Sequence, residues 1–187
     1  LQPSLNVETE KVNVPQQPFR TLVKYKNIKT VYFRIIQTSR DEIKKMDKRD
    51  YEKLWKDVVS LKYSKAWSET LPDPADYQDH SVEVKVEGLP VGTYFILASM
   101  DENFLLSKNI IAKQLVYVSN ISYINNNKNE FYVLNRDNGQ PLAGTEVQLW
   151  ESKYNYTESD YEETRAEKYA TDKNGLFTIK KATSYRN

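Results

Sequence analysis

The sequence predicts an all-β protein of two tandem antiparallel β-sandwich units, the first with an inserted amphipathic helix. Two observations predict the strands: 14 Tyr, 6 Phe and 3 Trp among 187 residues suit pleated, half-buried surfaces, and short alternating apolar segments recur between Pro, Gly and Asn turn signals. A third predicts the helix, because residues 39–60 carry apolar side chains at three- and four-residue spacing.

Charge and composition exclude several classes of function. Lys and Arg number 27 against 26 Asp and Glu, and no block of like charge would follow a phosphate backbone, so we expect no nucleic-acid partner. No apolar stretch approaches the roughly 18 residues of a membrane helix, so we expect no membrane span in this segment. The absence of cysteine excludes a disulfide framework, a thiolate metal site and a cysteine nucleophile. We expect no cofactor and no bound metal.

The first unit is predicted to cover residues 1–124. Residues 20–37 read as two strands, and 39–60 as one helix whose start is marked by the capping-box pair Ser39 and Glu42. Alternation and turn signals then predict further strands at 63–70, 80–87, 93–99, 104–112 and 115–123. About seven strands are enough to close a two-sheet sandwich.

The second unit is predicted to cover residues 125–187. The polar run 125–129 reads as a boundary or a tight inter-domain turn, and strands are expected at 131–135, 146–150 and 176–180. Residues 151–168 are charged and Tyr-rich, which is typical of an exposed loop or ragged edge strands. Three convincing strands are fewer than a closed sandwich needs, so this unit is expected to be truncated and to self-associate through exposed strands or to pack on the first unit. The predicted core of both units comprises Val31, Phe33, Ile35, Val82, Val84, Val86, Phe95, Leu97, Val133, Val147, Leu149, Phe177 and Ile179.

Residues 131–149 (FYVLNRDNGQPLAGTEVQL) and 171–177 (TDKNGLF) together resemble the second macroglobulin domain, MG2, of the bacterial alpha-2-macroglobulin family. Residues 116–120 (VYVSN) resemble the last strand of the preceding domain, and 89–94 (LPVGTY) resemble the family's entry into a central strand. The resemblance implies a macroglobulin or fibronectin-III-like sandwich. The helix at 39–60 departs from the plainest macroglobulin domain.

The same resemblance implies a non-catalytic scaffold segment of a protein that traps and inhibits proteases. Its expected partners are the remaining domains of the parent chain and target proteases. Its expected location is the periplasm or cell envelope, on a lipid anchor in the full-length protein. The alternative is a binding or adhesion module of an outer-surface protein, because carboxypeptidase regulatory-like sandwiches place Gly and Asp at the same turn offsets.

We expect no enzyme activity. Asp79, His80 and Ser81 supply the residue types of a serine hydrolase, but neighbouring strand residues point to opposite faces and cannot converge. The acid pairs Glu162 and Glu163, and Asp47 and Asp50, have the chemistry of a glycosidase, yet in a chain with 28% charged residues such pairs usually form a solvated face.

Two turn sequences and one aromatic cluster complete the candidate sites. Residues 137–139 (DNG) and 172–175 (DKNG) carry oxygens that suit Ca²⁺, but both lack the full acidic loop and read better as turns. Exposed aromatic side chains enrich binding surfaces, so an interaction surface for a sugar or a protein partner is one interpretation of the Tyr-rich segment, and edge-strand packing is the other. The residues of this surface are Trp150, Tyr154, Tyr156 and Tyr161.

Overall fold

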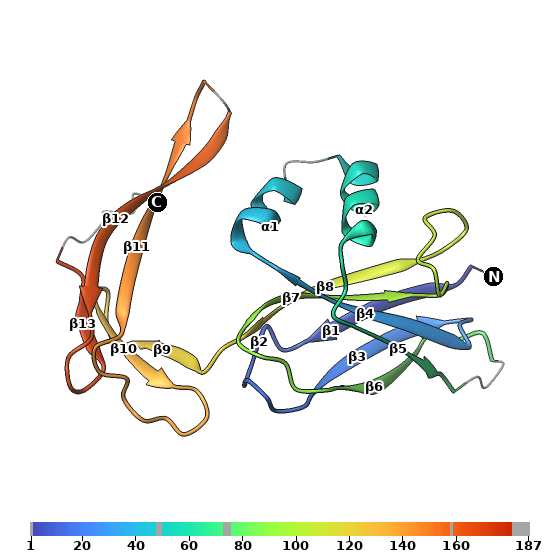
Figure 1. Cartoon of the computed structure of the whole chain (residues 1–187), viewed down its shortest axis with the longest axis horizontal. Coiled ribbons are helices and arrows are strands. Elements are labelled where there is room, and N and C mark those ends of the chain that lie inside the picture. The colour runs from blue at the N-terminus through green and yellow to red at the C-terminus, as the bar shows by residue number, and fades with distance from the viewer. Residues whose placement is uncertain (1, 48–49, 73–75, 158, 181–187) are drawn as a thin grey trace. The chain divides into compact units, whose positions relative to one another are not determined.

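The computed structural model describes residues 2–47, 50–72, 76–157 and 159–180. The chain divides into two compact units, Leu1–Ser119 and Asn120–Asn187 (Figure 1). The predicted boundary at 124–125 lies instead at 119–120, because β9 (Ile121–Asn125) pairs with β10 (Glu130–Asn135) inside the second unit.

The first unit is a sandwich of two sheets. A three-stranded antiparallel sheet has the order β1-β3-β6, and a five-stranded sheet has the order β2-β8-β7-β4-β5. Only β2 runs parallel to its described neighbour, β8. The strands are β1 (Ser4–Thr9), β2 (Val12–Asn13), β3 (Phe19–Lys26), β4 (Thr30–Thr38), β5 (Lys65–Thr70), β6 (His80–Val86), β7 (Gly92–Ser99) and β8 (Ile111–Val118).

The core of the first unit lies between these sheets, as the period-two pattern predicted. In β6, Val84 and Val86 are buried and Val82 packs half-buried beside them, while the charged residues between them face solvent. Phe33 on β4 stacks on Trp67 of β5 with ring centroids 4.7 Å apart. Each fully buried apolar side chain of this kind contributes about 1.5–3 kcal/mol to folding.

Two helices, rather than the single predicted one, cover the other face of the five-stranded sheet (Figure 1). They are α1 (Arg40–Asp47) and α2 (Tyr51–Ser60). The capping box is confirmed at α1, where Ser39 N–H donates to Glu42 Oε2 over 2.8 Å. Asp50 caps α2 by accepting a hydrogen bond from Lys53 N–H, and this second start signal explains the division.

The predicted strand at 104–112 is wrong for most of its length. Asp101 Oδ1 accepts hydrogen bonds from the backbone N–H groups of Asn103 and Leu105, so a side chain satisfies backbone donors that a strand would pair with a neighbour. The strand β8 begins only at Ile111. The prediction also missed β1, whose six residues pair with β3.

The second unit contains a three-stranded sheet, β13-β10-β9, and a two-stranded hairpin, β11-β12. The remaining strands are β11 (Glu146–Asn155), β12 (Asp160–Ala170) and β13 (Leu176–Thr178). The described residues of this unit therefore form five strands, against the three predicted. The run 125–129 turns β9 into β10, with Asn127 Oδ1 accepting from Asn129 N–H and Glu130 N–H, so it is not an inter-domain turn.

The core of the second unit is small. Val133 and Phe177 are buried, and Phe131 stacks on Phe177 with centroids 5.2 Å apart. In both units the predicted core is largely confirmed. The buried positions are Val31, Phe33, Ile35, Val84, Val86, Phe95, Leu97, Val133 and Phe177, and the half-buried ones are Val82, Val147, Leu149 and Ile179.

Candidate functional site

Residues 151–155 and 160–168 belong to the strands of the β11–β12 hairpin, as the second of the two predicted alternatives has it. This hairpin brings the predicted interaction residues together. Trp150 pairs with Arg165, and Tyr154 pairs with Tyr161. Directly paired residues of an antiparallel ladder point to the same face, and so do residues two apart on one strand. Trp150 and Tyr154 therefore share one face of the hairpin with Arg165 and Tyr161.

A β-bulge separates this register from that of the hairpin's root. Between the pairs Gln148–Lys168 and Trp150–Arg165, β11 contributes one residue and β12 contributes two. The Gln148 amide donates hydrogen bonds to the backbone carbonyls of Leu149 and Ala166, which satisfies oxygens at the point where the ladder is interrupted. The bulge thus shifts the pairing of the root by one residue relative to that of the tip.

Three tyrosines gather at the tip of the hairpin. The Tyr154 ring makes edge-on contacts with Tyr156 and Tyr161, each at a centroid distance of 5.1 Å. Tyr156 is 87% exposed and Tyr161 is 67% exposed. Edge-to-face pairs of this kind hold aromatic rings in fixed orientations. We call Trp150, Tyr154, Tyr156 and Tyr161 the aromatic face.

Arg165 is a member of this site that the sequence did not reveal. Its guanidinium carbon lies 5.4 Å from the centre of the Trp150 ring, within the range of a cation–π contact. Fourteen residues lie between the two in sequence, so only the pairing of the strands reveals the contact.

The opposite face of the hairpin is polar. It carries the cross-strand pairs Lys153–Glu162 and Asn155–Asp160. Asn155 Nδ2 donates to Glu162 Oε1 over 2.7 Å, and Lys153 Nζ lies 3.2 Å from a carboxylate oxygen of Glu151. Three of the aromatic rings, those of Trp150, Tyr154 and Tyr161, thus lie on one side of the hairpin, and the carboxylates of Glu151, Asp160 and Glu162 lie on the other.

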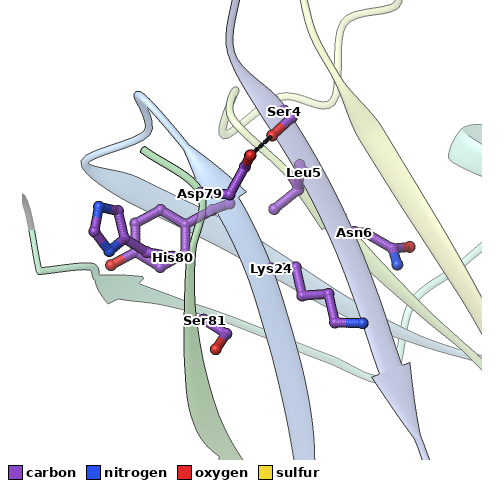
Figure 2. Close-up of a pocket in the computed structure, with 8 residues that line it drawn as sticks. Ser4, Leu5, Asn6, Lys24, Asp79, His80 and Ser81 are labelled. Carbon is purple, nitrogen blue, oxygen red and sulfur yellow. Dashed lines mark hydrogen bonds between the residues drawn. The ribbon is translucent and has the colours of Figure 1, made fainter. Parts of the chain in front are cut away.

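Asp79, His80 and Ser81 line a pocket of about 360 Å³ at one end of the three-stranded sheet, but their side chains point in different directions (Figure 2). The Ser4 hydroxyl donates to Asp79 Oδ1. His80 Nε2 lies 2.8 Å from Asp76 Oδ1 instead. Hydrogen bonds from the Gln78 backbone and from His80 hold the pKa of Asp76 below its ordinary value. The structure does not bring the three residues together as a triad.

The two candidate Ca²⁺ loops are turns, as the sequence favoured. Asn135 Oδ1 accepts from Asp137 N–H, and Gly139 has a φ of 72°. Asp172 Oδ1 accepts from Asn174 N–H and Leu176 N–H, so its carboxylate already serves the backbone. In the part of the chain that the structure describes, no cluster of three or more His, Asp or Glu side chains is placed to share a metal ion.

The acid pairs lie on exposed surfaces. Asp50 caps α2, while Glu162 and Glu163 are neighbours on β12 and therefore point to opposite faces of the hairpin.

No helix among the described residues is long and apolar enough to cross a bilayer.

No protein-family model and no curated protein sequence matches the chain. Solved structures do match. The crystal structure of native alpha-2-macroglobulin from Escherichia coli spanning domains NIE and MG1 matches with a TM-score of 0.61 and 13% identity, over 97% of this chain and 88% of that one. The chain has the fold of bacterial alpha-2-macroglobulin domains.

A longer alpha-2-macroglobulin crystal structure from E. coli, spanning domains MG0, NIE and MG1, matches with a TM-score of 0.63 and 16% identity. This chain covers 59% of that structure, so it spans less than two thirds of its length. The predicted fold class is confirmed by both matches. Both structures are described by the domain names NIE and MG1, so the assignment of the second unit to MG2 in particular stays a prediction.

Proposed function

We propose that the chain is a scaffold segment of a larger bacterial protein of the alpha-2-macroglobulin kind, which traps and inhibits proteases. The observation that carries this proposal is the match of both units together to NIE–MG1 over 97% of the chain. The resemblance of residues 131–149 and 171–177 to the second macroglobulin domain is independent support, because it depends on the turn and strand sequences and not on the fold.

The segment itself is proposed to have no catalytic activity. Hydrolysis by a serine nucleophile needs a base within hydrogen-bond reach and a third group that orients the base. Asp79 is paired with Ser4, and His80 with Asp76, which supports a structural role for these side chains. Replacing His80 by Gln in the complete protein is expected to leave its inhibitory activity unchanged.

The proposed partners are the remaining domains of the parent chain and target proteases. The proposed location is the periplasm or cell envelope, with a lipid anchor on the full-length protein. Support for the other domains as partners comes from the edge strand β9, which exposes the apolar side chains of Ile121, Tyr123 and Ile124. Exposed apolar residues on a sheet edge are typical of surfaces that other domains cover.

The test uses the complete protein that contains this segment. A protease is incubated with it, and cleavage of a large protein substrate and of a small peptide substrate are measured in parallel. Trapping predicts that cleavage of the large substrate falls while cleavage of the small peptide persists, because a trapped protease still admits small molecules. Undiminished cleavage of the large substrate at excess inhibitor would contradict the proposal.

The alternative function, a binding or adhesion module of an outer-surface protein, is favoured by the aromatic face of the β11–β12 hairpin. The two proposals differ in the rest of the parent chain. Repeated sandwich domains over more than a thousand residues would support the inhibitor, whereas a carbohydrate-active or barrel domain after this segment would support adhesion.

Self-association is a further proposed partnership. Two-stranded ribbons are marginally stable alone, and unpaired strand edges invite pairing with another copy. Sedimentation of the 187-residue chain at rising concentration is expected to show a growing dimer fraction. A monomer at every concentration, together with a second unit that resists protease when expressed alone, would contradict this.

A further inference from the structure

The aromatic face is a surface with an unusual concentration of exposed rings. Trp150 is 41% exposed and Tyr154 is 42% exposed, although each already contacts a neighbouring side chain. Trp150 and Tyr154 are four residues apart on one strand, which places their rings about 13 Å apart along the hairpin. A binding partner that lies along β11 would meet both.

The hairpin is acidic although the chain as a whole is nearly neutral. Residues 146–170 contain seven Asp and Glu against three Lys and Arg, while the full chain has a net charge of +1. Glu163 lies on the same face as Tyr161, because the two are separated by two positions on β12. Glu151, Asp160 and Glu162 lie on the opposite face, so Glu163 is the acid beside the rings, while the acidic hairpin as a whole attracts a cationic partner from a distance and steers its approach.

The hairpin also shows how a cation sits on this face. The Arg165 guanidinium lies over the Trp150 ring, so one ring of the set already takes a cation from the chain itself. The rings of Tyr156 and Tyr161 both contact the ring of Tyr154. Tyrosine rings bind guanidinium groups by the same electrostatic attraction as tryptophan.

We infer that the aromatic face of the β11–β12 hairpin binds an extended, arginine-bearing polypeptide segment, whose guanidinium groups stack on Tyr154, Tyr156 and Tyr161. Alternate side chains of an extended peptide lie on one side, about 6.6 Å apart, so a segment with arginine at every second position presents several cations to the rings. The inference does not depend on the proposed scaffold function, since it concerns only the surface of the hairpin.

The experiment measures binding of a fluorescein-labelled Arg-Ser-Arg-Ser-Arg peptide to the 187-residue chain by fluorescence anisotropy at low salt. A second peptide replaces every arginine by citrulline, which keeps the shape and part of the N–H donors but removes the charge. The variant Tyr154→Ser/Tyr156→Ser/Tyr161→Ser removes the rings. The matched control, Tyr51→Ser/Tyr77→Ser, removes two exposed tyrosines of the first unit.

The arginine peptide is expected to bind the wild type and the control variant alike, with binding weakened about tenfold by the triple variant, since each lost cation–π contact contributes to affinity. The citrulline peptide is expected to bind much more weakly. Added salt is expected to weaken the arginine peptide's binding. Circular dichroism checks that the triple variant folds, and the single variant Tyr156→Ser, at the most exposed ring, replaces it if it does not.

Three results would overturn the inference. One is equal binding of the arginine peptide to the wild type and to a folded tyrosine variant. Another is equal binding of the arginine and citrulline peptides. The third is ring-dependent binding of an oligosaccharide probe, chitohexaose, without any binding of the arginine peptide, which would identify the face as a glycan site.

Discussion

Gly88 packs directly against the backbone of Gln16: a Cβ atom at position 88 would lie 2.4 Å from the carbonyl carbon of Gln16. Gln16 N–H donates to Leu89 O over 2.9 Å beside this contact, so the two segments are held together. A side chain at position 88 therefore has no flexible neighbour to displace.

Gly88→Ala is expected to lower the free energy of unfolding by about 3 kcal/mol, because backbone atoms must move to admit the methyl group. Gly139→Ala is the control: its backbone has a φ of 72° but its Cβ would meet open space, so the expected loss is about 1 kcal/mol from backbone strain alone. Urea denaturation of both variants measures the difference. Equal losses would show that the contact with Gln16 is unimportant.

Val84→Ala is expected to cost about 1–3 kcal/mol of unfolding free energy, since Val84 is buried in the first core and the change removes two methyl groups. Glu83→Ala on the wet face is expected to cost under about 1 kcal/mol, because the ion pair between Glu83 and Arg20, although 2.7 Å long, is exposed to solvent. Thermal unfolding compares the two. A larger loss for Glu83→Ala would contradict the assigned faces of β6.

Glu42→Gln is expected to destabilise the protein at neutral pH and to have no effect in acid. The hydrogen bond from the Ser39 backbone, followed by those from the Thr38 and Ser39 hydroxyls, lowers the pKa of Glu42 in the folded state from 4.5. A lowered pKa means that the ionised Glu42 stabilises the folded state above pH 4.5. This stabilisation is lost as the pH falls through the lowered pKa. Denaturation curves at several pH values test this, and a difference that persists in strong acid would contradict it.

Thr171→Val tests the second unit. The buried Thr171 hydroxyl donates to Leu142 O and accepts from Thr145 N–H over 2.8 Å. Valine has a similar shape but leaves both backbone groups without this partner, at an expected cost of about 1–3 kcal/mol. Thr157→Val, at an exposed position near the hairpin tip, is the control and is expected to have little effect. Thermal unfolding followed by circular dichroism gives the comparison, and equal effects would show that the Thr171 hydroxyl is not essential.

The features that the sequence predicted correctly depend on local chemistry. Alternation identified the buried side of β6, and the pair Ser39 and Glu42 located the start of α1, because both signals act over a few residues. The missed features depend on pairing between distant segments. β1 was missed because a polar strand shows its identity only through its partner β3.

In the candidate site, too, the residues were predicted from the sequence but their spatial arrangement was not. The sequence named Trp150, Tyr154, Tyr156 and Tyr161 as a surface but left open whether they share a face. Trp150, Tyr154 and Tyr161 share a face because β11 pairs with β12 in one register from Trp150 to the tip, and that register leaves no mark in composition or periodicity.

That extra residue has a consequence for how the protein can vary. The root of the hairpin and its tip are each in register, and the mismatch between them is taken up at residues 166–167, opposite Leu149. Losing one of these two residues would straighten the ladder and rotate the tip, yet Tyr154 would still oppose Tyr161. A deletion of a single residue at this point would therefore turn the tyrosines to a new direction without rebuilding the cluster itself.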